Sequence, residues 1–342
     1  MKRLTERQKK ILLLVVREYI DSGQPVGSKS LVKNYPLDVS SATVRNEMRA
    51  LTEMGYLETK AGRIPTEDGY RFFVSEVMKK ANLPNAVQRT ISHQFSQTHS
   101  DTEQWMTLAA SVLAHQTQAV SVVTAPRNEQ ALFKHVELIS TQGRQILMVL
   151  VFVGGDVSQQ ILTLAEAVPQ PRLSHVAKRL NTQLASLSAE AIAALPARND
   201  LLEQDILLLI QQEMQARRES TAGELYMDGM ANILAEPSFA ESDQGRRTLG
   251  FFDDHSVLQQ VLANTLNDTR VGGVQVLIGG DQGWEELRQC SMVLARFGIP
   301  EQAVGTLGVL GPMRMPYART IPTVRYMADL LSDLMAENFS GE

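Results

Sequence analysis

The chain has 342 residues and a formal net charge of -5 at pH 7, with 44% hydrophobic and 21% charged residues. These proportions are ordinary for folded proteins, and the length favours two or three domains. The longest apolar runs, such as 146–153, are far shorter than the roughly 18 residues that suggest a transmembrane helix. The N-terminus is charged and shows no secretory signal pattern. We therefore expect a cytoplasmic protein with no membrane partner.

Charge is distributed unevenly along the chain. Residues 1–80 hold 15 lysines and arginines against 10 aspartates and glutamates, a net charge of +5, whereas the remainder carries -10. Such asymmetry is typical of a small nucleic-acid-binding module joined to a larger acidic body. Cys290 is the only cysteine, which excludes an intramolecular disulfide and a thiolate zinc cluster.

Three short helices are predicted in the basic module. Thr5–Gln8 fits a capping box that begins the first helix, and Gly23 is placed to end it. Ser28 is expected to cap a short second helix, and Ser40 precedes the third. The second and third helices are therefore separated by a tight turn.

The third predicted helix, residues 41–54, has two distinct faces. At about 100° per residue, its apolar side chains gather on one side as a core seam. That seam consists of Val44, Met48, Leu51 and Met54. Arg45, Asn46 and Arg49 fall on the opposite side, where arginine can bind guanine and asparagine can bind adenine in the major groove. Ser40, Ser41 and Thr43 are placed to hold phosphate, although a solvated polar face alone would give a similar pattern.

A basic β-hairpin is predicted directly after this helix. Gly55 ends the helix, a strand follows, and a turn bearing Lys60 and Arg63 leads into a second strand at Ile64–Thr66. Such a wing is suited to grip phosphate or to enter the minor groove. Helices, turn and hairpin together predict a winged helix-turn-helix that binds double-stranded DNA.

The acidic body reads as a mixed α/β domain interrupted by helices. Alternating, β-rich segments predict strands at 119–123, 133–139, 145–153, 157–167 and 273–278. Helical periodicity dominates residues 172–218, and residues 224–235 are predicted to form a further helix. A sheet that stops at a helical block and later resumes suggests an inserted domain.

Enzyme and cofactor interpretations of the body are weak. The glycine-rich segment Gly279–Gly283 follows a strand, but it matches neither the P-loop nor the dinucleotide-binding pattern. Asp253–His255 is better explained as a helix cap than as a metal or acid-base site. Histidines are scattered without ligand spacing. We therefore expect no enzyme activity, cofactor or metal.

Several of these motifs resemble the HrcA family of heat-inducible transcription repressors. The N-terminal resemblance is carried by Leu4–Gln8, Glu18–Ile20, Gly23–Lys29, Leu37–Met48 and Ala61–Arg71. The C-terminal resemblance is carried by Leu225–Tyr226, Gly229–Leu234, Ile278–Gly279, Cys290–Val293 and Leu307–Tyr317. One departure is visible: the family usually has Pro-His-Thr-Ser before the Ala-Gly-Arg of the wing, whereas here only Thr59-Lys60 follows Glu58. The wing is therefore shorter.

The resemblance implies an α+β fold with a particular organisation. It implies a winged helix at 1–80, a discontinuous GAF-like domain at 81–168 and 222–342, and an inserted, largely helical dimerising domain at 169–221. It further implies a homodimer that represses chaperone operons from an inverted-repeat operator and whose activity the GroEL chaperonin modulates. The alternative is a ligand-responsive winged-helix regulator whose GAF-like domain binds a metabolite.

Overall fold

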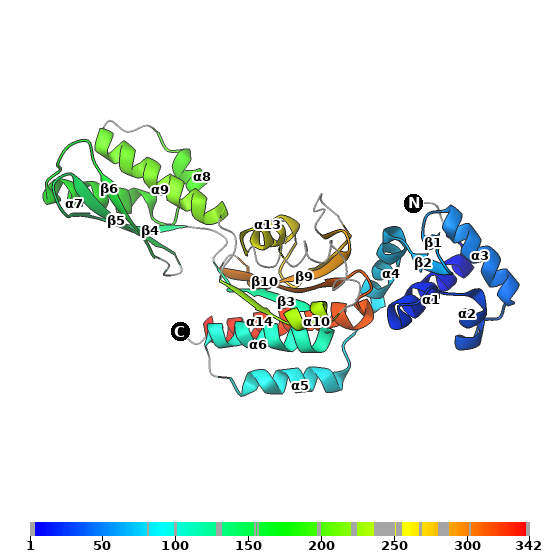
Figure 1. The fold of residues 1–342 in the computed structure, drawn as a ribbon. Coiled ribbons are helices and arrows are strands. Elements are labelled where there is room, and N and C mark those ends of the chain that lie inside the picture. Colours follow the sequence, from blue (N-terminus) through cyan, green and yellow to red (C-terminus); the bar gives the residue numbers. More distant parts are fainter. Residues whose placement is uncertain are drawn as a thin grey trace. The chain divides into compact units, whose positions relative to one another are not determined.

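The structure is a computed structural model, shown in Figure 1. It describes residues 4–80, 82–98, 101–127, 132–153, 155, 157–196, 200–219, 224–235, 250, 255–266, 269–279, 287–300 and 302–339. The chain divides into two compact units. The first comprises Met1–Pro126, Gly223–Gly298 and Gly305–Glu342, and the second comprises Arg127–Ala222 and Ile299–Val304.

The first unit begins with the predicted winged helix. Its elements are α1 (Glu6–Ser22), α2 (Ser28–Asn34), α3 (Ser41–Glu53), β1 (Leu57–Thr59), β2 (Arg63–Pro65) and α4 (Glu67–Lys80). The capping box at Thr5 is present, and Gly23 ends α1 with a left-handed φ of 65°, a conformation that glycine adopts without a steric penalty. Buried residues of α1 pack against the seam of α3, so that α3 lies across α1 and next to α2.

The prediction that Ser28 caps α2 is wrong. Gly27 occupies the cap position, and no side chain makes a cap hydrogen bond there. Ser28 is the first helical residue, and its side chain is only 8% exposed. Because Ser28 is already within the helix, its hydroxyl stands one residue past the position from which a side chain caps.

The body of the first unit is built on a five-stranded sheet of order β7-β3-β10-β9-β8. Its strands are β3 (Val120–Thr124), β7 (Leu225–Asp228), β8 (Val274–Ile278), β9 (Cys290–Ile299) and β10 (Ala303–Pro312). Its helices are α5 (Asn85–Ser96), α6 (Thr102–Thr117), α10 (Met230–Leu234), α13 (His255–Leu266) and α14 (Tyr317–Phe339). Figure 1 shows α13 on one side of this sheet and α6 with α14 on the other.

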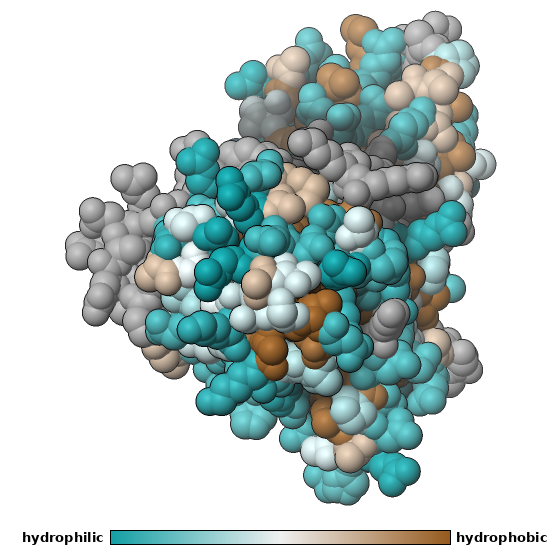
Figure 2. Space-filling view, turned by 90° about the vertical axis from the view of Figure 1, so that its right-hand side faces the viewer, coloured by the Kyte–Doolittle hydropathy of each residue, from teal (hydrophilic) through white to brown (hydrophobic). Residues whose placement is uncertain are grey.

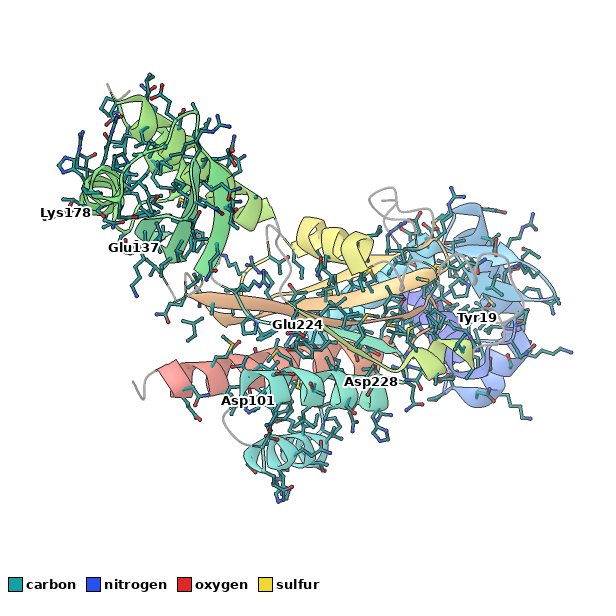
Figure 3. The ribbon with its side chains drawn as sticks, turned by 60° about the vertical axis from the view of Figure 1, so that its left-hand side comes forward. Tyr19, Asp101, Glu137, Lys178, Glu224 and Asp228 are labelled. Carbon is teal, nitrogen blue, oxygen red and sulfur yellow. The ribbon has the colours of Figure 1, made fainter. Side chains whose placement is uncertain are left out.

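The prediction of one helix over 224–235 is wrong. Residues 225–228 form β7, which pairs antiparallel with β3, and only Met230–Leu234 is helical. Figure 3 labels Glu224 and Asp228, which stand at the two ends of this segment. Gly229 separates strand from helix with φ 83°, and a Cβ there would lie 2.4 Å from the Ala119 carbonyl oxygen. The sharp change of direction therefore requires glycine.

The second unit is an α/β layer rather than a largely helical insertion. Its strands are β4 (Phe133–Ser140), β5 (Gln145–Phe152) and β6 (Val157–Thr163), and its helices are α7 (Gln170–Leu184), α8 (Ala189–Ala193) and α9 (Leu201–Glu219). These strands pair only with one another in the order β4-β5-β6. The compact unit therefore begins at Arg127, not at 169 as expected, because its core needs these strands beneath the helices.

The three-stranded sheet has one buried and one open face. Alternate residues of β4 and β5 pack with α7 and α9 in a single apolar core. The opposite face places aliphatic side chains side by side across the strands. They are Ile139, Leu147 and Ile161 in one row, Val149 in the next, and Val151 and Val157 in the third. Ile161 is 70% exposed and Val157 is 49% exposed.

Candidate nucleic-acid interface

Helix α3 presents the polar face that its sequence predicts. Val44, Met48 and Leu51 are buried. Arg45 and Asn46 are exposed, and the side chain of Arg49 is 77% exposed. The structure thus brings the three predicted base-reading residues together on one side of the helix. Met54, expected in the seam, is the C-cap and is only partly buried.

These three side chains differ in their intramolecular partners. Arg49 Nε donates to Glu53 Oε1 at 3.2 Å, one helical turn later. Within the described part of the chain, Arg45 and Asn46 side chains make no hydrogen bond or ion pair with other residues. Figure 2 views the molecule from the side of α2 and α3, where hydrophilic side chains predominate. Arg45 and Asn46 can therefore meet a ligand without first breaking a protein contact.

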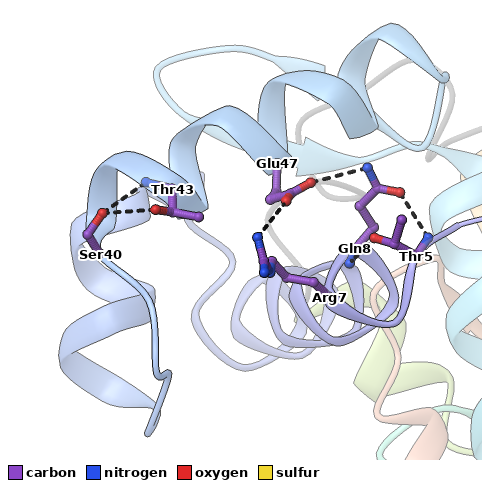
Figure 4. A network of polar contacts seen from close by, with 6 residues as sticks. All are labelled: Thr5, Arg7, Gln8, Ser40, Thr43 and Glu47. Carbon is purple, nitrogen blue, oxygen red and sulfur yellow. Dashed lines mark hydrogen bonds and ion pairs between the residues drawn. The ribbon is translucent and has the colours of Figure 1, made fainter.

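The start of α3 is held by its own hydroxyl groups. Ser40 Oγ accepts a hydrogen bond from the Thr43 backbone N at 3.2 Å and lies 3.0 Å from Thr43 Oγ1 (Figure 4). Ser41 is the first helical residue. The positive end of the helix dipole and the free backbone N–H groups of this turn favour an anion. The predicted phosphate-binding residues therefore lie where such binding is chemically sensible.

The predicted wing is present as the hairpin of β1 and β2. Leu57 pairs with Pro65 and Thr59 with Arg63, leaving a turn of Lys60, Ala61 and Gly62. Lys60 is exposed at this tip, with its Nζ 3.9 Å from Glu58 Oε1. An exposed pair at that distance contributes little energy, so that Lys60 can exchange Glu58 for phosphate.

Arg63 is less available than the sequence suggests. Its guanidinium Nη1 donates to Thr59 Oγ1 at 2.7 Å, and its Nε is buried without a hydrogen-bond partner in the described structure. Its backbone also pairs with Val26, through N···O distances of 2.8 and 3.0 Å. This backbone pairing joins the wing to the segment before α2. The sequence did not predict the pairing, because the two segments are far apart in the chain.

Helix α4 fixes the winged helix to the body within the first unit. Tyr70 and Phe73 of α4 meet Tyr317 with ring centroids 6.2 and 6.5 Å apart. Arg71 Nη2 donates to the Ile278 carbonyl at 3.4 Å. Burial raises the pKa of the Tyr70 hydroxyl, as expected for a phenol at a packed junction. The module is therefore joined to the body by packed side chains as well as by the chain itself.

The body contains the segments for which the sequence left a ligand or metal interpretation open. Gly279 has φ 67° and lies against Glu67, while Gly280–Gly283 fall outside the described residues. Asp253 and Asp254 also fall outside them, as does the His255 side chain. Among the side chains that the structure describes, no group of three or more His, Cys, Asp or Glu could hold a metal ion. No helix in those same ranges combines the length and apolar character needed to cross a membrane.

The second unit carries a shallow hollow between β4 and α7. It is lined by His135, Glu137, Lys178 and Asn181, among others. Figure 3 labels Glu137 and Lys178 on these two elements. His135 Nε2 lies 2.6 Å from Glu137 Oε1, and Asn181 bonds the backbone of Val136 at 2.7 and 3.0 Å. His135 and Glu137 thus pair with each other, and Asn181 satisfies the edge of β4.

Comparison with known proteins identifies the chain. Residues 3–78 match the winged helix-turn-helix DNA-binding domain of the HrcA transcription repressor, and residues 103–321 match the HrcA protein C-terminal domain. The heat-inducible transcription repressor HrcA of Roseiflexus castenholzii is 43% identical over 99% of this chain and 96% of its own length. That of Herpetosiphon aurantiacus is 41% identical over 98% and 96%.

A solved structure shows that the fold has been observed experimentally. The crystal structure of a protein described only as hypothetical is 23% identical, with a TM-score of 0.61 over 98% of this chain and 99% of that one. The similarity at this level concerns the fold alone. The family is decided by two observations: two family domains together span most of the chain, and near full-length relatives are more than 40% identical to it. The chain belongs to the HrcA family of heat-inducible transcription repressors, and its N-terminal module is that family's winged-helix DNA-binding domain.

Proposed function

We propose that this repressor binds an inverted-repeat operator upstream of chaperone genes as a homodimer. In this proposal Arg45, Asn46 and Arg49 read base edges in the major groove. The observation that carries the proposal is the exposed face of α3, on which Arg45 and Asn46 have no competing protein partner within the described residues. Arginine and asparagine are the side chains that pair bidentately with guanine and adenine.

The remaining predicted residues are assigned to the DNA backbone. Ser40, Ser41 and Thr43 surround the N-terminus of α3, where hydroxyl and backbone N–H groups favour a phosphate oxygen. Lys60 stands exposed at the wing tip. Arg63 contributes positive charge from the second wing strand, although its hydrogen bond to Thr59 limits its reach. The net charge of +5 over residues 1–80 supports the same division of roles.

The homodimer is proposed to form through the open face of the sheet in the second unit. Six aliphatic side chains lie on this face, with Glu137, Gln159 and His135 completing its rows; they are Ile139, Leu147, Val149, Val151, Val157 and Ile161. A second copy can cover this surface because an isologous interface sets the same patch of each chain against the other. The edge of β4 is already bonded by Asn181 and Gln170, which favours face-to-face packing over strand addition there.

A two-fold dimer explains why the operator should be an inverted repeat. Protein symmetry is then matched by DNA symmetry, with one recognition helix in the major groove of each half-site. Family membership supports the further proposal that the GroEL chaperonin keeps the repressor active. Heat would then relieve repression by diverting the chaperonin to unfolded proteins.

The proposal is tested with the full-length chain and a randomised pool of DNA duplexes. Repeated selection for binding should enrich an inverted repeat, and sedimentation should show two chains on each selected duplex. If the folded protein enriches no sequence from the pool, the proposal that α3 reads bases is wrong. Restoration of operator binding by a small metabolite, with no effect of GroEL, would favour the ligand-responsive alternative.

A further inference from the structure

Glu47 lies on the recognition helix between its buried seam and its exposed face. At about 100° per residue, it stands about 60° from Val44 around the helix axis. Its side chain is 20% exposed, compared with 77% for Arg49 two residues later. Figure 4 shows that it points toward the first turn of α1. It is thus turned away from the face assigned to the bases.

Two side chains of α1 hold the two oxygens of the Glu47 carboxylate. Gln8 Nε2 donates to Oε2 at 3.1 Å, and Arg7 Nη1 lies 3.5 Å from Oε1. Gln8 is itself fixed by the capping box. Its Oε1 accepts from the Thr5 backbone N at 3.0 Å, and its backbone N donates to Thr5 Oγ1 at 3.2 Å. One amide therefore caps α1 and binds α3 at the same time.

This connection acts on a helix with a narrow apolar seam. Only Val44, Met48 and Leu51 of α3 are buried, and they lie within a sector of about 60° around its axis. Apolar contacts are non-directional, so that a hydrogen bond at the edge of the seam defines the rotation of the helix more sharply than the seam itself. When the helix rotates by about 20°, an atom that lies about 6 Å from the helix axis is displaced by about 2 Å. That displacement exceeds the distance range of a hydrogen bond and would misplace a bidentate base contact.

Other roles for Glu47 fit the contacts less well. A carboxylate can accept a hydrogen bond from cytosine, but both oxygens here already have protein partners. A merely solvated glutamate would be more exposed and would not meet a fixed donor. The ion pair with Arg7 alone contributes little, because Arg7 is 57% exposed. The directional contact with Gln8 is the informative one.

We propose that Glu47 is a positioning residue that determines operator specificity by fixing the rotation of α3 against the capped end of α1. The proposal rests on the proposed function, in which Arg45 and Asn46 read bases. It assigns no DNA contact to Glu47 itself. Removal of the Gln8–Glu47 hydrogen bond should therefore weaken the discrimination between operator and unrelated DNA, rather than the general attraction to DNA.

The test compares dissociation constants of full-length variants for selected operator and for scrambled duplex. Glu47→Ala is expected to lower the ratio of the scrambled-DNA to the operator dissociation constant by about tenfold, less than the loss of one base contact from each half-site would give. Binding to scrambled DNA should be unchanged or slightly tighter, because a negative charge is removed. Glu47→Gln retains an acceptor for Gln8 and should keep most of the discrimination.

Two further variants separate positioning from charge and from misfolding. Combining Gln8→Glu with Glu47→Gln reverses donor and acceptor while keeping a Thr-x-x-Glu capping box, and should restore the ratio. Glu6→Ala removes the same charge from a carboxylate whose described partner is Lys9, and should leave the ratio unchanged. Circular dichroism melts verify that each variant is folded at the assay temperature.

The outcomes distinguish this inference from the proposed function. If the wild-type chain discriminates between the two DNAs but folded Glu47→Ala discriminates equally well, the positioning role is wrong. It is also wrong if Glu47→Ala and Glu47→Gln tighten binding to operator and to scrambled DNA by the same factor, since the loss of charge alone then explains the effect. If the wild-type chain itself does not discriminate, the proposed function fails, whatever the variants do.

Discussion

Base reading and phosphate binding should fail in different ways when single side chains are removed. Arg45→Ala or Asn46→Ala removes a side chain that has no described intramolecular partner, so that the substitution breaks no contact within the protein. Each bidentate base contact contributes about 1 to 3 kcal/mol. In a dimer the substitution removes that contact from both half-sites, which gives about 2 to 6 kcal/mol, or at least about a 30-fold weaker complex with operator.

The structure ranks the other side chains of the interface below these two. Arg49 must give up its 3.2 Å contact with Glu53, a helical pair that contributes about 0.3 to 0.5 kcal/mol, so that Arg49→Ala should cost less than Arg45→Ala. Lys60→Ala removes one exposed charge from each wing. It should weaken binding to operator and to scrambled DNA alike. It should also reduce the slope of log affinity against log salt concentration by about 0.9 for each phosphate that the wing no longer neutralises.

Binding isotherms over a salt series, on operator and on scrambled duplex, measure both effects. Arg45→Ala and Asn46→Ala should change the operator isotherm and leave the scrambled one nearly unchanged. Lys60→Ala should change both. If Arg45→Ala and Asn46→Ala weaken both DNAs equally, the exposed face of α3 lies along the DNA backbone. The reasoning that assigns it to the bases would then be refuted.

Other predictions concern the fold, the dimer and ionisation. Gly23→Ala places a side chain at φ 65° and should destabilise the chain by about 1 to 2 kcal/mol in urea unfolding; an unchanged midpoint would contradict this. Ile161→Glu should give monomers in sedimentation, because it buries a charge in the proposed interface, and a persistent dimer would move the interface elsewhere. Arg179→Ala removes the guanidinium 3.0 Å from the fully buried Glu203 carboxylate and should lower stability by about 1 to 3 kcal/mol, with partial recovery on adding Glu203→Gln. Burial and the hydrogen bond to Glu224 raise the pKa of Tyr226 to about 12 from its ordinary value of 10.0. Between these two pH values the folded state keeps a proton that the unfolded chain releases, so that the free energy of unfolding should fall as the pH rises from 10 to about 12. Denaturation melts over this pH range measure the fall. The same fall in Tyr226→Phe would contradict the prediction.

The recognition helix was predictable because its determinants are local. The cap at Ser40 and the seam at Val44, Met48 and Leu51 depend on neighbours within one or two helical turns. The same holds for the wing, whose turn residues lie between two short strands. These features follow from hydrogen-bonding chemistry and periodicity within short segments of the sequence.

The errors concern features that distant parts of the chain decide. Residues 225–228 are apolar enough for helix or strand, and pairing with β3 about a hundred residues earlier makes them a strand. Strands at 133–163 alternate in the same way whichever sheet they join, so that the sequence could not assign them to the second unit. The buried strands β9 and β10 were missed for a related reason, since continuous apolar runs show no alternation.

The least predictable feature of the candidate site is the contact of Glu47 with Gln8. These residues are 39 positions apart, and both side chains are ordinary for helix surfaces. Their meeting depends on how α1 crosses α3, which is a matter of side-chain packing. The sequence signal available was the capping box, which fixes where the Gln8 amide stands but not what else it binds.

Footprinting of the full-length chain on the promoters of its own chaperone genes tests the central claim most directly. The account predicts protection of an inverted repeat, with both half-sites protected at the same protein concentration, and Arg45→Ala should raise that concentration by at least about 30-fold. Absence of protection by folded dimer, at concentrations that bind scrambled DNA, would contradict the account.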